Sequence, residues 1–600
     1  MKFTVKNPSM SSTFFPPVFS ETGFDSIASS HSLKVAGSLV LLTLCFSISL
    51  FGFFFADDFY NIKNALSSGW SLWKLMGGYI IDSRGFQDGW ITPPLSELKM
   101  QYFRPIFLAS LLIDHAVWGL RAWGYHISNI VLHLMVVSAF FGVLRELIPG
   151  KRGMALFGAT LYGLMPFHAM SVAWVSGRTE LLPALGMMVA LWSYLRFARG
   201  GGGIFYFLSL GTASLALFSK ENALVLPFII LAVWRLVLLR PRLSFGWQLP
   251  YFLITIPYLA LRTKALGGFP LPISSPFYHS WNEPGFLTWA MAKATCVFYS
   301  LLLHVPMIFP IELFLVKTPW LIVPLILVAC LIAGWIVMLI HAGDDNALRR
   351  TGWLAVVWVV VSVLPTAPLL VAPFYFYFPL AGITLLYLVI WNRLSERGRP
   401  LWITRSRQRK IMAVSLIAFF CIGLQAANGM FVAMSREAKR LLGQIGEQLP
   451  AGTEPIDLYL VDSPFVTGPP KAALQLFWPK HLFKLYILSP YPAKHDWDEV
   501  ESMIKRTDPF TLELTAIDAP YYSGIYGILT MGFSERAFIK EGREYATDGY
   551  KVKLAEVVQS GPYRLNFVKR LVFRFERPIN SPGNLFLRYD KDRGFKWFEP

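Results

Sequence analysis

The sequence predicts an α-helical polytopic membrane protein with about eleven transmembrane helices, followed by a C-terminal extracytoplasmic α/β domain. Hydrophobic residues make up 54% of the 600 residues and charged residues only 15%, too few for the surface of a soluble protein of this size. Apolar runs of roughly the length that crosses a bilayer, about 20 residues, recur as far as residue 430. Beyond that residue, short β-rich runs separated by turn residues replace them.

The first apolar run follows a polar, serine-rich stretch without a cleavage site. Residues 1–33 are therefore expected to be a cytoplasmic tail, and the run that ends at Phe55 a retained span rather than a signal peptide. Two apolar segments, 103–120 and 291–310, begin and end on the same side and are expected to lie in the outer interface. The predicted spans lie near residues 34–55, 127–147, 153–168, 180–198, 204–218, 222–239, 246–262, 320–341, 352–371, 375–392 and 411–430.

Lysine and arginine residues set the predicted orientation, because cytoplasmic loops carry an excess of them. Basic groups recur after every second span, and the largest group lies between residues 393 and 410. Placing these groups in the cytoplasm puts the N-terminus inside. It puts these segments outside: 56–126, 167–180, 219–222, 263–319, 371–375 and everything after 430. The net charge of +18 is explained by this bias, and we expect no nucleic-acid binding because basic and aromatic residues do not alternate on a soluble surface.

The chain is thus divided into a membrane domain, 34–430, with its first outer loop at 56–126, and an extracytoplasmic α/β domain, 431–600. The second domain opens with a helical pattern over Met434–Leu449. Its predicted strands are Ile456–Val461, Phe483–Leu488, Phe510–Leu514, Lys551–Val557, Tyr563–Phe575 and Leu585–Tyr589. The four cysteines lie in apolar stretches and are expected to be buried free thiols: Cys45, Cys296, Cys330 and Cys421.

Two adjacent carboxylates, Asp57 and Asp58, follow the first span directly. Charges at the membrane edge are costly unless water or a counter-charge stabilises them or they serve a function. One interpretation is an interfacial polar cap. The other is a catalytic pair, in which one carboxylate takes a proton from an acceptor hydroxyl. The second would raise the pKa of the first or help to hold a divalent cation, Mg²⁺ or Mn²⁺. A second pair, Asp344 and Asp345, falls in a predicted cytoplasmic loop and is interpreted as solvated.

Charged and polar residues gather at the outer ends of several spans, on the side of the acidic pair. This composition suits a site in which arginine and lysine bind a lipid phosphate while a carboxylate handles the acceptor. Each residue could instead be an interfacial anchor or part of an internal ion pair, and His133, inside a span, is expected to be a packed core histidine. The candidate substrate-binding residues are Arg104, His126, His168, Arg178, Glu180, Lys220 and Glu221.

An acidic pair after the first span is typical of the GT-C superfamily of polyprenol-phosphate-sugar-dependent glycosyltransferases. Residues 103–105 and 124–133 resemble the Tyr-Arg-Pro and Tyr-His-Leu-x-Asn-x-x-x-His pattern of the TPR-containing O-mannosyltransferases. Residues 165–182 resemble their His-Pro-Val-His-Thr-Glu-Ala-Val-Ala-Trp-Val-Ser-Gly-Arg-Ala-Glu-Leu-Leu block, and 219–222 their Ser-Lys-Glu motif. Residues 375–380 are similar to their Arg-Tyr-Leu-Tyr-Leu-Pro motif.

The resemblance covers roughly residues 50–390 and implies a membrane hexosyltransferase of GT-C type. Its donor would be a polyprenyl-phosphate sugar, with mannose one candidate, and its acceptor a hydroxyl of a protein or glycan. Asp57 or Asp58 would orient or deprotonate that hydroxyl, and polyprenyl phosphate would leave with inversion. The phosphate would lie near basic residues such as Arg104, Arg178 or Lys220. A bacterial relative acting on the periplasmic face of the cell inner membrane is implied.

Departures from the pattern leave the sugar and the acceptor open. Met165 and Met170 replace a histidine and a glutamate of the long block, the arginine of the last motif is absent, and no 34-residue helical repeat follows. Some GT-C enzymes use a metal at the acidic loop and the protein O-mannosyltransferases do not, so a divalent cation also stays open.

Two other classes of function remain as alternatives. One is a transporter or flippase of lipid-linked glycans, which would place charged residues at the bilayer midplane on broken helices. The other is a polymerase or ligase of surface polysaccharide with a lipid diphosphate donor. The domain after residue 430 is expected either to govern the acceptor or to cap the last spans.

Overall fold

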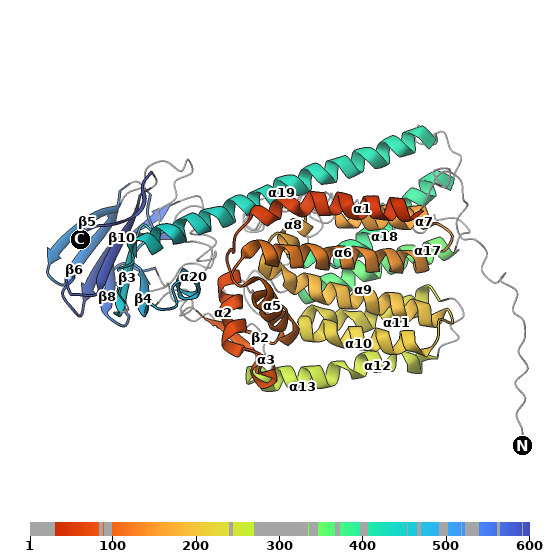
Figure 1. The fold of residues 1–600 in the computed structure, drawn as a ribbon, viewed down its shortest axis with the longest axis horizontal. Helices are drawn as coiled ribbons and strands as arrows, with labels where there is room; N and C mark the ends of the chain where they lie inside the picture. Colours follow the sequence, from red (N-terminus) through yellow and green to blue (C-terminus); the bar gives the residue numbers. More distant parts are fainter. Residues whose placement is uncertain are drawn as a thin grey trace, which may run out of the picture.

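One long helix, α19 (Ser406–Gln448), joins a helical bundle to a β-rich domain in the computed structural model of the protein (Figure 1). The β-rich domain lies at one end of this helix and holds the C-terminus, while the bundle packs along the rest of it. The structure describes residues 31–82, 88, 99–238, 244–268, 334, 346–366, 372–396, 406–452, 454–464, 470–490, 502–517, 519–521, 539–560, 565–590 and 592–600.

Helices occupy the predicted spans that fall within these residues. They are α1 (His31–Phe46) with η1 (Ser47–Phe51), α6 (Ala122–Leu147), α7 (Arg152–Gly163), α9 (Arg178–Ala198), α10 (Gly203–Ser219), α11 (Leu226–Leu236), α12 (Leu249–Leu253), α13 (Thr255–Leu266), α17 (Asn346–Val363), α18 (Pro379–Glu396) and α19. Within the described part of the chain, four helices are long and apolar enough to cross a membrane: Ser32–Phe51, Ala122–Leu147, Val175–Ala198 and Arg407–Gln448. The predicted segments 320–341 and 291–310 lie outside the described residues, so the total of about eleven stays a prediction.

Small residues let neighbouring helices of the bundle approach closely. A Cβ at Gly186 of α9 would lie 2.8 Å from Ala216 Cβ of α10, and one at Gly158 of α7 would lie 2.6 Å from a methyl carbon of Leu388 of α18. Helices in a bilayer gain little from the hydrophobic effect, so close backbone packing of this kind stabilises their association.

Basic residues gather at the end of the bundle that lies away from the acidic pair. Glu146, near the end of α6, pairs with Arg196 at 3.5 Å and with Arg199 at 3.3 Å, and Lys151 donates a hydrogen bond of 2.6 Å to Asn392 Oδ1. The start of α6 lies instead next to the acidic loop, through His126. These basic residues and the acidic pair thus lie at opposite ends of the bundle, and the same arrangement underlies the predicted orientation.

The first outer loop folds into short elements over the end of the bundle. They are α2 (Asp58–Ser68), α3 (Leu72–Leu75), β1 (Tyr79–Asp82), β2 (Lys99–Tyr102) and α5 (Pro105–Trp118). Strands β1 and β2 pair antiparallel, with Tyr79 opposite Tyr102. Helix α5 is the predicted segment 103–120, and proline at its first position suits a helix start.

The C-terminal domain is a sandwich of two sheets. Strands β3 (Ile456–Val461), β4 (Phe483–Ile487), β10 (Asn584–Asp590) and β11 (Gly594–Trp597) form one sheet, in the order β11-β10-β3-β4. Strands β5 (Ser502–Asp508), β6 (Thr511–Ala516), β7 (Glu544–Ala546), β8 (Tyr550–Ser560) and β9 (Leu565–Phe575) form the other, in the order β5-β6-β9-β8-β7. Side chains of both sheets meet in one core, in which Tyr459 stacks on Tyr486 and Phe586. The six predicted strands are present, and β5, β7 and β11 are additional.

The domain and the membrane region share a second hydrophobic core. Phe54 and Phe59 of the first outer loop belong to it together with Ile445 of α19, Leu458 of β3 and Leu474 of α20 (Pro470–Phe477). Helix α19 runs through residue 430 without a break and includes most of the helix predicted over 434–449. The domain is therefore fixed to the end of the bundle that carries the acidic pair.

The length of α19 gives a test of orientation. At 1.5 Å per residue the helix is about 65 Å long, roughly twice the thickness of the hydrocarbon core of a bilayer. In a background without the four native cysteines, Glu447→Cys and Arg407→Cys place a thiol at exposed positions near its two ends. We expect a membrane-impermeant maleimide added to intact cells to label the first variant and to label the second only after permeabilisation. The reverse pattern would contradict the predicted orientation.

Candidate functional site

Asp58 is buried, with 1% of its surface exposed, and its carboxylate fastens the first outer loop to the start of α9. Oδ1 accepts a hydrogen bond from the backbone N–H of Ser176 at 2.7 Å, and Oδ2 accepts one from the backbone N–H of Phe55 at 2.9 Å. Trp174 Nε1 adds a hydrogen bond of 3.1 Å to Phe55 O. Burial raises the pKa of Asp58 to about 7, although the hydrogen bonds from Ser176 and Phe55 lower it in part.

Asp57 is partly exposed, in contrast to its neighbour. It precedes α2 and follows Ala56, whose φ of 51° places a non-glycine residue in the left-handed region. Such strain persists where the surrounding structure imposes it, and it is frequent at active sites. Burial raises the pKa of Asp57 to about 6, and the positive charge of Arg104 lowers it in part. A carboxyl group with this pKa is ionised at neutral pH and basic enough to accept a proton.

Arg104 precedes α5 and forms a two-pronged ion pair with Glu221. Its Nη2 lies 2.6 Å from Oε1 and its Nε 3.3 Å from Oε2, and its guanidinium carbon lies 4.2 Å from the centre of the Tyr102 ring. Burial raises the pKa of Glu221, but the charge and hydrogen bond of Arg104 outweigh it and hold that pKa at about 2. The pair therefore keeps both charges across the physiological pH range.

The next ion pair joins Lys220, between α10 and η4 (Glu221–Val225), to Glu180 in the first turn of α9. Both side chains are buried, at 4% and 5% exposure. The Lys220 ammonium lies 5.1 Å from the centre of the Tyr375 ring and 5.5 Å from that of Phe374. Cation–π contacts of this kind help to hold a desolvated ammonium. Lys220 and Glu221, consecutive residues of the Ser-Lys-Glu motif, thus pair with different segments of the chain. The rings of Tyr375 and Phe374, at the start of the last motif and just before it, lie next to Lys220.

Arg178 is engaged in packing the bundle. Its Nε donates to Asn129 Oδ1 at 2.8 Å, its Nη1 contacts the oxygens of Ser110, and its Nη2 binds Asp114 and the Tyr125 carbonyl. The side chains of Arg178 and Asp114 are 1% and 6% exposed. These contacts of Arg178 join α5, α6 and α9, and its predicted role in phosphate binding stays a prediction.

The two predicted histidines lie in different surroundings. His126 of α6 sits behind the loop of the acidic pair, where a Cβ added to Gly52 would lie 3.2 Å from its Nε2. His168 begins α8 (His168–Val172), and its ring lies 4.4 Å from that of Tyr377 and 5.3 Å from that of His133. His133 is a packed core residue, as predicted, with hydrogen-bonding contacts of 2.6 Å to Tyr377 Oη and 3.0 Å to Gly163 O.

Arg262 is a candidate that the sequence reasoning missed. It lies on α13 one turn after Tyr258, which packs against Phe103 at 5.9 Å and is within electrostatic range of Arg104 and Glu221. Its Nε is buried and has no hydrogen-bond partner among the described residues. A basic residue at the outer end of the span predicted near 246–262 was the signal that could have identified it.

The described side chains around the acidic pair do not form a set of ligands that fits a divalent cation. Both oxygens of Asp58 accept backbone N–H groups, and the positive charge nearest Asp57 is the guanidinium of Arg104. Among the described residues no third histidine, cysteine or carboxylate joins the pair in an arrangement able to hold a metal ion. Oxygen ligands free of competing donors are what Mg²⁺ and Mn²⁺ require.

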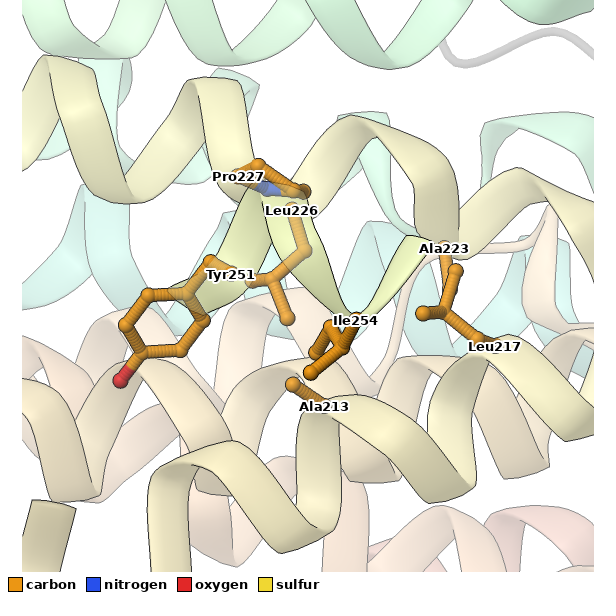
Figure 2. A pocket seen from close by; sticks show the side chains of 7 residues that line it. All are labelled: Ala213, Leu217, Ala223, Leu226, Pro227, Tyr251 and Ile254. Carbon is orange, nitrogen blue, oxygen red and sulfur yellow. The ribbon is translucent and has the colours of Figure 1, made fainter. Parts of the chain in front are cut away.

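A small apolar pocket lies elsewhere in the bundle, among α10, η4, α11 and α12 (Figure 2). It has no room for a water molecule. None of its lining residues is among the candidate site residues, and the Tyr251 hydroxyl points to Ser209, to which it donates a hydrogen bond of 2.6 Å. We interpret this pocket as imperfect packing. Its lining is Ala213, Leu217, Ala223, Leu226, Pro227, Tyr251 and Ile254.

Comparison with known proteins agrees with the motifs. No protein-family model matches the chain. It is 31% identical over 139 residues to Protein O-mannosyl-transferase Tmtc1 of Drosophila melanogaster, which is 23% of this chain and 16% of the relative. It is 27% identical over 209 residues to Protein O-mannosyl-transferase TMTC1 of Homo sapiens, which is 32% of this chain and 23% of the relative. The chain therefore spans less than a quarter of the length of these curated relatives.

Among solved structures, the chain is similar to ArnT from Cupriavidus metallidurans bound to undecaprenyl phosphate. The identity is 16%, the TM-score is 0.42, and the match covers 76% of this chain and 86% of that one.

The contacts of Arg178 give a prediction about stability. Asp114→Asn leaves a buried guanidinium without its counter-charge, which costs about 3–5 kcal/mol when one partner of such a pair is removed. We expect a lower unfolding temperature in detergent for Asp114→Asn and for Arg178→Met, and recovery of part of the loss when Asp114→Leu is combined with Arg178→Met. If both single variants unfold at the wild-type temperature, the pair does not hold the bundle together.

Proposed function

We propose that this protein is a membrane hexosyltransferase of GT-C type that moves a sugar, with mannose the first candidate, from a polyprenyl-phosphate donor to an acceptor hydroxyl of a protein or glycan. The observation that carries the proposal is the contrast within the acidic pair. Asp58 is held by two backbone N–H groups, whereas Asp57 is partly exposed, has a pKa of about 6 and lies near Arg104. Such an arrangement supplies a general base beside a cation.

The proposed reaction is a single displacement at the anomeric carbon. Asp57 accepts the proton of the acceptor hydroxyl while the hydroxyl oxygen forms a bond to the anomeric carbon. The bond from that carbon to the phosphate oxygen breaks from the opposite side, which inverts the configuration. Polyprenyl phosphate leaves with the bonding electron pair, and nearby cations stabilise its developing negative charge.

Arg104 and Lys220 are the proposed phosphate-binding residues. Each is held at the outer end of the bundle by a carboxylate, Glu221 or Glu180, so its position is fixed before the donor arrives. Preorganised cations need no rearrangement as charge develops, which is the main advantage of an enzyme site over water. Arg262 is a third candidate, since it is a basic residue that interacts with Tyr258, which itself is within electrostatic range of Arg104 and Glu221.

The location of the ion pairs favours a transferase over a flippase. The described ionic groups near the acidic pair lie at span ends, whereas a transporter of charged lipid headgroups requires such groups near the midplane. In the proposed arrangement the N-terminus is cytoplasmic and the acidic pair and the C-terminal domain lie on the periplasmic face of the inner membrane. The polyprenyl chain stays in the bilayer while its phosphate reaches the basic residues.

A transfer assay tests the proposed function directly. Purified protein is incubated with polyprenyl-phosphate sugars, and released polyprenyl phosphate and glycosylated acceptor are measured. We expect Asp57→Asn to lower turnover by ~10²-fold or more, the usual effect of removing an acid–base group, without lowering the unfolding temperature. Asp592→Asn, at an exposed turn of the C-terminal domain, is the matched control and should keep full activity. Equal activity of Asp57→Asn and wild type would refute the role of Asp57.

The pKa of Asp57 sets the expected pH dependence. The base must be deprotonated, so turnover should be constant above about pH 7 and fall roughly tenfold per pH unit below about pH 6. Arg104 lowers the pKa of Asp57, so Arg104→Gln should move the midpoint of this fall to higher pH as well as weaken donor binding. A midpoint that stays in place in Arg104→Gln would show that another group controls the acidic limb.

A further inference from the structure

The segment just before the acidic pair is bound by α19. The backbone N–H of Phe53 donates to Ser435 Oγ at 3.0 Å, and Arg436 Nε donates to Phe51 O at 3.0 Å. Two turns earlier along α19, Asn428 Nδ2 donates to Cys45 O at 3.0 Å. The chain thus enters the outer loop along a helix that continues directly into the C-terminal domain.

A side chain of that domain also reaches the loop. The ring of Phe477, the last residue of α20, lies 5.5 Å from the ring of Phe53, 6.4 Å from that of Phe54 and 6.5 Å from that of Phe59. These three residues stand on both sides of the acidic pair in the sequence, and Phe54 and Phe59 are buried. Aromatic rings at such distances attract one another beyond the effect of burial alone.

Further contacts hold α20 against the loop. Lys63 of α2 donates a hydrogen bond to Gln475, and Lys471 forms an ion pair with Asp88. Asp88 also accepts the backbone N–H of Leu485 in β4 at 2.9 Å. Helices α2 and α20 lie beside each other at the junction of bundle and domain (Figure 1).

The backbone between Phe55 and Asp58 needs this support. Ala56 lies in the left-handed region at φ 51°, a conformation that an alanine does not keep unless its neighbours enforce it. Asp58 and Trp174 fix the turn from the side of α9. The aromatic group of Phe53, Phe54, Phe59 and Phe477 is the corresponding contact on the side of the C-terminal domain.

We propose that Phe477 is a positioning residue, whose ring keeps the Phe55–Asp58 turn in the conformation that aims Asp57 at the acceptor hydroxyl. The C-terminal domain then takes part in the chemistry, rather than only presenting the acceptor or capping the spans. This inference rests on the proposed function for its kinetic part, but the packing on which it depends can be measured separately.

The test compares Phe477→Ala, Phe477→Leu and the matched control Phe510→Ala in the full-length protein. Phe510 is 40% exposed in the turn between β5 and β6, in the sheet that does not contain β3 and β4. We expect Phe477→Ala to lower kcat by about 10- to 100-fold, the effect of a small misplacement of a reacting group. The KM for the donor should stay within about twofold, because Arg104 and Lys220 are untouched. Phe477→Leu should recover most of kcat, and Phe510→Ala should match wild type.

Two further measurements separate positioning from general damage. Hydrogen exchange of residues 53–62 should quicken in Phe477→Ala while the spans and the sheets keep their wild-type rates. The acidic limb of the kcat profile should move to lower pH, because opening the aromatic group lessens the burial of Asp57.

Wild-type kcat and exchange in Phe477→Ala would overturn the inference. Faster exchange throughout the domain with unchanged KM and pH profile would also overturn it, because the role would then be structural only. If wild type transfers no sugar from any donor, the proposed function fails, whereas the exchange measurement still decides whether Phe477 holds the loop.

Discussion

The buried carboxylate of Asp58 is the interaction on which the outer end of the molecule depends. It accepts the N–H groups of Phe55 and Ser176, which lie far apart in the sequence, and so joins the first outer loop to the start of α9. A buried charge requires such donors, because burying it without them costs several kcal/mol. The same link sets the distance from Asp57 to Glu180, Lys220 and the rest of the outer ion pairs.

The ion pairs of Arg104 and Lys220 place buried charges at the end of the helical bundle that carries the acidic pair. Arg104 with Glu221 and Lys220 with Glu180 are each neutral as pairs, so they are less costly to desolvate than single charges. Their partners come from α5, α9 and the segment after α10, and this spreads the positioning over several helices. Aromatic faces of Tyr102, Phe374 and Tyr375 replace part of the lost hydration.

The sequence predicted the parts of the structure that leave a local signal. Apolar length identified helices such as α6 and α9, and short β-rich runs between turn residues identified β3 and β8. Strand β5, with the sequence Ser-Met-Ile-Lys-Arg-Thr-Asp, was missed because it is a largely exposed edge strand without an apolar run. The acidic pair was found from its position, but a sequence cannot show that Asp58 is buried and Asp57 is not. The pairing of Arg178 with Asp114 was hidden likewise, because it depends on how α5 and α9 cross.

The packing of Phe477 against Phe53, Phe54 and Phe59 has a consequence for biosynthesis. The acidic loop leaves the ribosome long before Phe477, so the two segments meet only after all of α19 has been synthesised. Domains fold as units during synthesis, and contacts between distant segments form late. A nascent chain that has not yet reached Phe477 therefore carries the residues of the acidic loop without this contact.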